Sequence, residues 1–226
     1  MKRVNVEVWS DFVCPWCWIA KRRLEKAVNS LSGEIEVTVT HKAYRLARGM
    51  APEDLKLALF NKFGSHIAAT RMMEAVAANG VMEGLTYNFG TMRFGDTTDA
   101  HVLVKSVENG EVKSRLVERL FAASTTEGLD IFDRDVLLGI AKSVGISDRK
   151  IAFDDNSKLS EIAHEERAIN SIGSGVPLFI FNGKSYLSGA REAEAFQKAL
   201  LQTAVHAAKL DEGSDAQICG MDGCRI

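Results

Sequence analysis

Apolar and polar residues alternate near the start of the chain, and this period of two is typical of a β-strand. Residues 4–8 place valine at every second position, and residues 35–40 repeat the pattern with isoleucine and valine. Between them, apolar residues recur at helical spacing over residues 17–31, with Pro15 suited to the first helical position and Gly33 placed to end the helix. The pattern therefore predicts a strand–helix–strand unit.

The middle of the chain lacks this alternation. From residue 46 to residue 170, helical patterns follow one another, and most of them are followed by a glycine that can end a helix. The predicted helices span residues 52–63, 66–79, 99–108, 112–127, 135–144 and 158–169. These segments predict an all-helical block.

Strand character returns after the helical block. Residues 178–181 and 184–187 are predicted strands, and the Asn182-Gly183 pair between them is typical of a tight hairpin turn. We expect Ser188 to cap a final helix whose apolar positions continue to Val205. The chain therefore ends in a predicted strand–strand–helix unit.

This order of elements predicts an α/β protein with a thioredoxin-like fold and an inserted all-helical domain. The outer segments would form one domain around the inserted block. We expect the first part of the thioredoxin-like domain at 1–45, the helical insertion at 46–170, the second part at 171–210 and a mobile polar tail at 211–226.

Four residues, Cys14-Pro15-Trp16-Cys17, stand where the first strand gives way to the first helix. A helix N-terminus favours negative charge, so it favours the thiolate of Cys14, which is the nucleophilic form in disulfide exchange. Cys17 lies one turn further on, close enough to form a disulfide with Cys14 and to resolve a mixed disulfide. The pair could also be half of a zinc site, but the strand–CxxC–helix context favours redox chemistry. We expect Cys14 to be exposed and to attack, and Cys17 to resolve.

Composition narrows the possible partners. The formal net charge is −2, and the mixed charges leave no basic face for nucleic acid. The hydrophobic content of 46% supports a core without a disulfide scaffold, and the chain has four cysteines. Neither a signal-peptide core nor a stretch of membrane-spanning length is visible, so we expect no membrane partner and a cytoplasmic location, where dithiols are normally kept reduced.

Several segments resemble the DsbA-type oxidoreductases, and specifically their cytoplasmic FrnE-like branch. The resemblance covers nearly the whole chain and implies a thiol–disulfide oxidoreductase that reduces or isomerises disulfides. It implies protein disulfides or glutathione as partners, no cofactor and no metal. The matching segments are Ser10-Asp11-Phe12-Val13-Cys14-Pro15-Trp16-Cys17, Gly175-Val176-Pro177, and Asn182-Gly183 followed by Ser188-Gly189-Ala190.

The resemblance also implies roles for residues around the dithiol. Pro177 would be a cis-proline facing the two sulfurs, although an X–Pro bond taken alone is more often trans. Val176 would offer its backbone to an extended substrate, and Pro15 and Trp16 would border the attacking sulfur. DsbA proteins have a histidine where this chain has Trp16, so we expect a less oxidising disulfide than theirs.

Cys219 and Cys224 resemble the second, C-terminal cysteine pair of FrnE-like proteins. The glycines between them would let the two sulfurs meet, which predicts an auxiliary dithiol able to exchange with Cys14–Cys17 or with substrate. An inert tail is the alternative for this pair.

The sequence assigns no catalytic role to several polar residues. We expect Asp11 to complete the turn before the first helix, and we expect His101 to be a packed or solvated helix residue. Lys42, Arg45 and Arg48 are expected to form a solvated linker into the helical block.

Two other functions compete with disulfide exchange. Glutathione-dependent isomerases and transferases of the kappa type share the helical insertion, but they typically keep a serine at the helix start, where this chain has Cys14. A zinc-binding holdase module would use all four cysteines as ligands.

Overall fold

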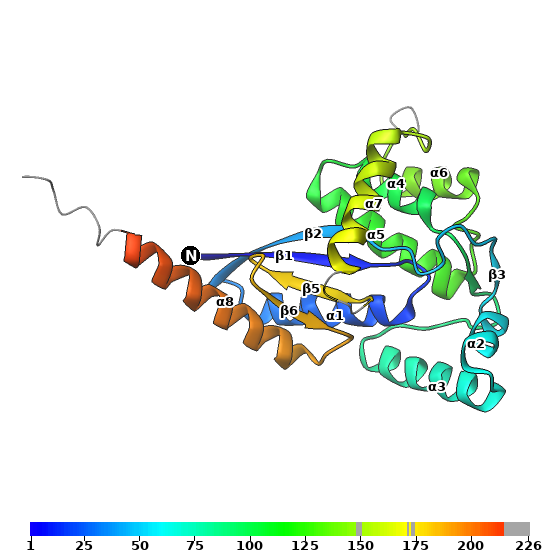
Figure 1. The fold of residues 1–226 in the computed structure, drawn as a ribbon, viewed down its shortest axis with the longest axis horizontal. Helices are drawn as coiled ribbons and strands as arrows, with labels where there is room; N and C mark the ends of the chain where they lie inside the picture. The colour runs from blue at the N-terminus through cyan, green and yellow to red at the C-terminus, as the bar shows by residue number, and fades with distance from the viewer. Residues whose placement is uncertain (148–150, 171, 173–174, 215–226) are drawn as a thin grey trace, which may run out of the picture.

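The computed structural model describes residues 1–147, 151–170, 172 and 175–214. Its centre is a four-stranded sheet in the order β2-β1-β5-β6 (Figure 1). β1 (Lys2–Ser10) pairs in parallel with β2 (Ile35–Ala43) and antiparallel with β5 (Leu178–Phe181), which pairs with β6 (Ser185–Ser188). Strands from before and after the insertion therefore join in one sheet, as the thioredoxin-like fold class requires.

Helices cover both faces of this sheet. α1 (Pro15–Ser30) and α8 (Ala193–Ser214) pack together against one face of the sheet, while the end of α7 (Asn156–Asn170) packs against the other face (Figure 1). Side chains alternate between the two faces, as the pleat of a strand demands. Val8 therefore packs in the core with α1 and α8, while the next residue, Trp9, packs against α7.

The insertion between β2 and β5 consists mainly of helices. Its elements are β3 (Glu53–Asp54), α2 (Leu55–Phe63), α3 (His66–Met82), β4 (Arg93–Phe94), α4 (Thr98–Lys105), α5 (Gly110–Ala122), the π-helical turn η1 (Ala123–Glu127), α6 (Arg134–Ser143) and α7. Its apolar side chains continue into the start of α1, where Cys14, Cys17 and Trp18 join the same core cluster as Leu103 and Phe121. The first turn of α1 therefore lies at the junction of the sheet and the insertion.

The fold class predicted from the sequence is confirmed, and three local expectations are corrected. β3 and β4 form a two-residue ladder inside the otherwise helical insertion. Ser188 does not cap the final helix, because it pairs with Leu178 at the end of β6 and α8 begins at Ala193. α8 continues to Ser214, past the expected boundary at residue 210. The division of the chain into domains stays a prediction.

Within the described ranges, no helix combines the length and the apolar character needed to cross a membrane.

Candidate active site

Cys14 occupies the N-cap of α1, at the turn that follows β1. Its backbone is extended, with φ −97° and ψ 104°, and Pro15 takes the first position of the helix. The Cys14 N–H donates to the Asp11 carbonyl at 3.1 Å, and the Cys17 N–H donates to the Cys14 carbonyl at 3.0 Å. The predicted placement of the dithiol at a helix N-terminus is therefore confirmed, and both cysteines are free thiols.

Cys14 is buried rather than exposed. Its exposed fraction is 7% and that of Cys17 is 2%, so the expectation that Cys14 is exposed is wrong. The cause is the insertion, whose apolar residues cover the start of α1. Cys14 nevertheless lines a cleft of about 500 Å³, while Cys17 is not among the lining residues.

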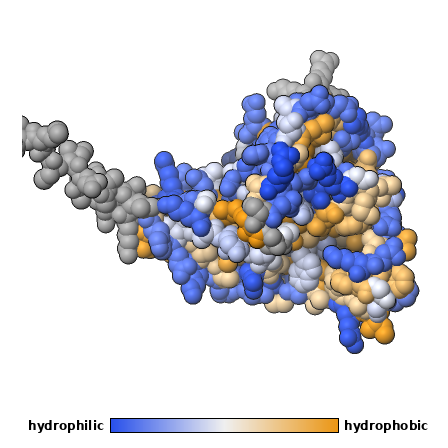
Figure 2. Space-filling model, viewed as in Figure 1, coloured by the Kyte–Doolittle hydropathy of each residue, from blue (hydrophilic) through white to orange (hydrophobic). Residues whose placement is uncertain are grey.

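The walls of this cleft come from both parts of the fold. Pro15 and Trp16 follow Cys14 on α1, and the opposite wall comes from the segment after β2, from α2 and from Met72 of α3. Most of the lining is apolar, with Lys62 among the few charged residues. Figure 2 shows apolar side chains over the region of α2 and α3, and Ile67 there is 66% exposed. Cys14 therefore opens onto an apolar surface.

The two sulfurs have different surroundings. Burial raises the pKa of the Cys17 thiol well above its usual value, and the hydrogen bond with Cys14 and the charge of Cys14 raise it further. Tyr87 also contacts the motif, because its hydroxyl donates to the Pro15 carbonyl at 2.9 Å. Burial, followed by the charges of the two cysteines, raises the pKa of Tyr87, so this hydroxyl stays a donor.

The peptide bond between Val176 and Pro177 is cis, as the sequence resemblance predicts. Gly175 precedes it at φ 64°, a left-handed conformation that favours glycine. Val176 is half-buried and packs against the cluster that contains Cys14 and Cys17 as well as against that of Trp9.

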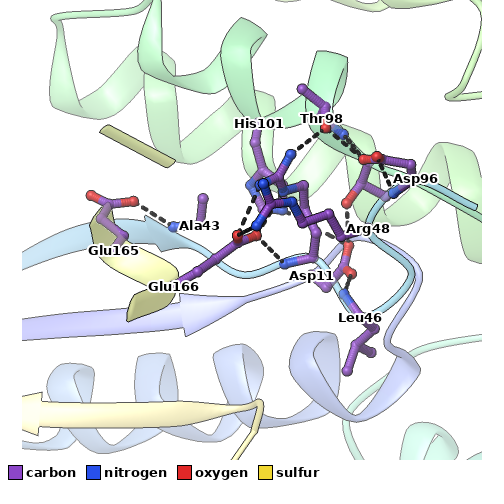
Figure 3. A network of polar contacts seen from close by, with 12 residues as sticks. Asp11, Ala43, Leu46, Arg48, Asp96, Thr98, His101, Glu165 and Glu166 are labelled. Atoms are coloured by element: carbon purple, nitrogen blue, oxygen red, sulfur yellow. Dashed lines mark hydrogen bonds and ion pairs between the residues drawn. The ribbon is translucent and has the colours of Figure 1, made fainter. Parts of the chain in front are cut away.

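Asp11 is the centre of a buried polar network beside the dithiol (Figure 3). Its exposed fraction is 0%. One carboxylate oxygen accepts from the Thr97 hydroxyl at 2.7 Å, and the other accepts from the Leu46 N–H at 2.6 Å. The expected role as a turn residue is thus incomplete, because the carboxylate also holds the segment after β2 and the start of α4.

His101 faces this carboxylate from α4. Its Nε2 lies 3.8 Å from Asp11 Oδ1 and has no hydrogen-bond partner, and its ring packs 4.9 Å from that of Phe12 between centroids. His101 is 4% exposed, so of the two expected states the structure places it in the packed one. The sequence offered no sign that a buried acid would face it.

The basic residues after β2 do not form a solvated linker. Arg45 donates to both carboxylate oxygens of Glu166 on α7, at 2.6 and 2.8 Å, and to the Thr98 hydroxyl at 2.7 Å. Lys42 pairs with the buried Glu165. Of the three basic residues only Arg48 is largely exposed, so the expectation was wrong for the other two.

Residues 5–201 match the family described as DSBA-like thioredoxin domain. The chain belongs to this family. The DSBA-like chain is 24% identical over 210 residues to the uncharacterized protein YwbO of Bacillus subtilis (strain 168), covering 87% of this chain and 96% of that one. It superimposes on the crystal structure of the probable DsbA oxidoreductase SCO1869 from Streptomyces coelicolor with a TM-score of 0.81, at 28% identity over 99% of each chain.

A third similarity shows the fold alone, because its sequence identity is low. The cytosolic disulfide reductase DsbM from Pseudomonas aeruginosa, solved with GSH, has a TM-score of 0.59 and 17% identity over 92% of this chain and 99% of that one. The DsbA-type resemblance is therefore confirmed, while assignment to the FrnE-like branch stays a prediction. The chemical roles of Cys14, Cys17, Pro15, Trp16, Val176 and Pro177 also stay predictions.

The predicted tail pair, Cys219 and Cys224, lies outside the described residues. In the part of the chain that the structure covers, no three histidine, cysteine, aspartate or glutamate side chains are grouped as metal ligands would be.

Proposed function

We propose that this DSBA-like protein is a thiol–disulfide oxidoreductase that reduces or isomerises disulfides. The observation that carries the proposal is the unequal placement of the two thiols in the first turn of α1. Cys14 caps the helix and lines the cleft, whereas Cys17 lies behind it. The helix N-terminus favours a thiolate at Cys14, which makes Cys14 the attacking sulfur.

Reduction then takes two exchange steps. The Cys14 thiolate attacks one sulfur of the substrate disulfide, forms a mixed disulfide and releases the other sulfur as a thiolate. Cys17 loses its proton and attacks Cys14, which forms the Cys14–Cys17 disulfide and releases the second substrate thiolate. Two electrons pass from the dithiol to the substrate, and an external thiol such as glutathione returns them.

The surroundings of Cys14 support substrates larger than a simple thiol. The cleft beside it is mostly apolar and continues toward the exposed apolar side chains of α2 and α3. Trp16 and Val176 are both partly exposed and would contact substrate next to the sulfur, and Pro177 keeps a backbone N–H away from it. We propose disulfide-bearing polypeptides as substrates, with glutathione as a second partner, since the similar DsbM was solved with GSH.

A cytoplasmic location belongs to the same proposal. DsbM is described as a cytosolic disulfide reductase, and Trp16 stands where the strongly oxidising DsbA proteins have a histidine. Both observations favour a reducing or isomerising role.

The C-terminal pair would act as an auxiliary dithiol. α8 leads from the β6 side of the sheet toward the beginning of β1, away from the end where Cys14 lies (Figure 1). A helix of 22 residues is about 33 Å long, whereas the five residues from Ser214 to Cys219 span at most about 18 Å. We therefore propose that the pair exchanges with substrate or with a second copy of the chain rather than with its own Cys14.

Two serine variants test the main proposal. Cys14→Ser should abolish insulin reduction by glutathione, while Cys17→Ser should accumulate a mixed disulfide that mass spectrometry detects at Cys14. The proposal fails if Cys17→Ser loses all reactivity while Cys14→Ser keeps it. Zinc at one ion per chain in the purified protein, together with no insulin reduction, would instead favour the holdase.

The glutathione-dependent isomerase remains the enzyme alternative. Its chemistry uses bound glutathione and no second thiol in the protein. Full activity of Cys17→Ser on an isomerisation substrate, with none of the disulfide activities, would favour it.

A further inference from the structure

β2 forms one edge of the sheet, so only one of its two sides pairs with another strand of the described chain. In the order β2-β1-β5-β6, that side faces β1. The N–H of Tyr44, just after β2, donates to the Ser10 carbonyl of β1 at 3.2 Å. Because the backbone groups of successive strand residues point to opposite sides, the even-numbered residues of β2 point toward β1 and the odd-numbered residues point away from it.

The two ends of this outer side already have hydrogen-bond partners. The Ile35 N–H donates to the Leu31 carbonyl at 3.2 Å, and the Ala43 N–H donates to Glu165 Oε2 at 2.7 Å. Among the described residues, the outward N–H and C=O groups between these ends form no hydrogen bond. They belong to Val37, Val39 and His41.

The middle of β2 is accessible to a further strand. Val39 is 39% exposed, and its neighbours Thr38 and Thr40 are exposed on the other face of the sheet. Edge strands are usually protected by a proline, a bulge or a lysine, because an open edge is a template for pairing. β2 has no proline, its register with β1 runs without a bulge, and residues 37–41 include no lysine.

A second copy of β2, antiparallel and centred on Val39, would satisfy all of these open groups. Val39 then lies opposite the second copy's Val39, and Val37 lies opposite His41. Both are hydrogen-bonded pairs of an antiparallel ladder, because their backbone groups point outward. A centre at Val37 or at His41 would instead bring Ile35 or Ala43 into the ladder, and the N–H groups of these two residues are already used.

The side chains of β2 match in the same register. Glu36 stands opposite Lys42, and Thr38 stands opposite Thr40. Pairs of opposite charge and pairs of threonines stabilise neighbouring antiparallel strands. The Glu36 side chain is 51% exposed and that of Lys42 is 23% exposed, so both reach solvent at this edge. The exposed Val39 side chains would cover each other at the centre.

We propose that two copies of the chain pair through β2, antiparallel and centred on Val39, so that their sheets become one. Such a contact is isologous, because each copy uses the same residues about a two-fold axis. It is one strand wide and therefore smaller than a permanent dimer interface, so the dimer dissociates on dilution.

Pairing in this way brings the tail of one copy to the dithiol of the other. α8 leads toward the beginning of β1 (Figure 1), and in an antiparallel pair this end lies beside the second copy's end of β1, where Cys14 is. A two-fold axis perpendicular to the sheet keeps α1 and α8 of both copies on the same face. The two β1 strands are three strand spacings apart, about 14 Å, whereas the residues from Ser214 to Cys219 span at most about 18 Å.

The dimer gives the tail pair a defined task, and this part of the inference rests on the proposed function. A Cys219 or Cys224 thiolate attacks one sulfur of the second copy's Cys14–Cys17 disulfide, which forms a mixed disulfide between the copies and releases the other sulfur as a thiolate. The remaining tail thiol loses its proton and attacks in turn, which forms the Cys219–Cys224 disulfide and completes the reduction of Cys14–Cys17. Two electrons and two protons pass from the tail to the dithiol, and glutathione then reduces the tail.

Sedimentation velocity of the full chain under reducing conditions, at a series of concentrations, tests the pairing. We expect the wild type to shift from monomer to dimer. Glu36→Lys should raise the dimer dissociation constant about tenfold, because it turns two pairs of opposite charge into pairs of like charge. Val39→Lys, which sets two lysines against each other at the centre, should raise it at least as much.

The other edge of the same sheet provides the matched control. Tyr186 is 57% exposed on β6, so Tyr186→Lys adds the same charge to an edge strand outside the proposed contact and should leave the dissociation constant unchanged. A wild type that is monomeric at every concentration, or a dimer that neither β2 variant weakens, would overturn the pairing. If Val39→Lys does not fold, as a melting curve would show, Glu36→Lys decides.

A cross-link tests the register. Hydrogen-bonded antiparallel pairs have Cα atoms about 5.5 Å apart, which is within the range of a disulfide. With the four native cysteines replaced by serine, Val39→Cys should oxidise to a covalent dimer and Tyr186→Cys should stay monomeric. Equal cross-linking of the two variants would overturn the register.

Mixed variants test the relay between copies. Cys14→Ser keeps a tail pair but lacks the attacking thiol, while the double variant Cys219→Ser with Cys224→Ser keeps the dithiol but lacks the tail pair. Mixing them should reduce insulin with glutathione faster than the tail variant alone, and Val39→Lys in both chains should abolish the gain. No gain in a mixture that forms dimers would overturn the relay. Failure of Cys14 to form any mixed disulfide in Cys17→Ser would instead refute the proposed function and leave the pairing intact.

Discussion

Arg23 should be among the most damaging positions for substitution outside the dithiol. Its side chain is buried in the middle of α1 with 1% of the residue exposed. Its guanidinium pairs with Glu83 and Glu192 at 2.9 Å each, and donates to Asn79 Oδ1 at 2.9 Å and to the Ala190 carbonyl at 2.8 Å. These contacts join α1 to α3 in the insertion and to the segment before α8.

Arg23→Ala should lower the free energy of unfolding, because it leaves the buried carboxylate of Glu83 without one of its two cationic partners. Breaking a buried ion pair by removing one partner costs about 3–5 kcal/mol, because the remaining charge loses its compensation. The side chain of Glu83 is 5% exposed but keeps Lys26 at 2.7 Å, so we expect the lower end, about 3 kcal/mol. For a chain of this length, that loss corresponds to a drop in melting temperature of about 6–12 °C.

The loss of unfolding free energy caused by Arg23→Ala should depend on pH. Burial would raise the pKa of Glu83, but the hydrogen bonds from Lys26 and Arg23 outweigh it and lower the pKa. A carboxyl group whose pKa is lower in the folded than in the unfolded chain stabilises the fold. This stabilisation is complete at a pH above the unfolded-state pKa, and it is lost as the pH falls through the folded-state pKa. The difference in unfolding free energy between wild type and Arg23→Ala should therefore shrink in acid.

Urea unfolding followed by circular dichroism, at pH 7 and at several acidic values, measures both effects. Arg22→Ala is the matched control on the same helix, because the Arg22 side chain is 38% exposed and pairs with Glu118 at the surface. Such a pair contributes about 0–1 kcal/mol. An Arg23→Ala loss no larger than that of Arg22→Ala, or one that stays constant into acid, would refute the reasoning.

Two further predictions concern residues around and beyond the dithiol. Pro177→Ala should lower the rate of insulin reduction, because it returns a backbone N–H to the loop proposed to face the sulfurs; unchanged turnover would remove Pro177 from the site. Replacing Cys219 and Cys224 by serine, or truncating the chain after Ser214, should slow disulfide exchange without changing the melting temperature. If the pair exchanges between copies of the chain, the share of the wild-type exchange rate that depends on Cys219 and Cys224 should grow with protein concentration. Full activity of both variants on several substrates would refute the auxiliary role.

The sequence by itself was sufficient for the order of the main helices and strands and for the position of the dithiol. Period-two alternation, helical spacing and the Asn182-Gly183 turn are properties of neighbouring residues, so they can be read without knowing the fold. The same holds for Cys14, whose place at a helix N-terminus depends on Pro15 and on the pattern that follows. Boundaries were less certain where pairing decided them, as at Ser188, which joins a strand through its partner Leu178.

Only the tertiary structure decided what surrounds the sulfurs. Asp11 meets the Thr97 hydroxyl across 86 positions of sequence, and Arg45 meets Glu166 across 121. No local pattern encodes such contacts, because they arise when the insertion folds back over the end of the sheet. The same packing buries Cys14, makes the cleft beside it and sets His101 against a carboxylate, since burial and electrostatic surroundings belong to the packed chain and not to any one segment of it.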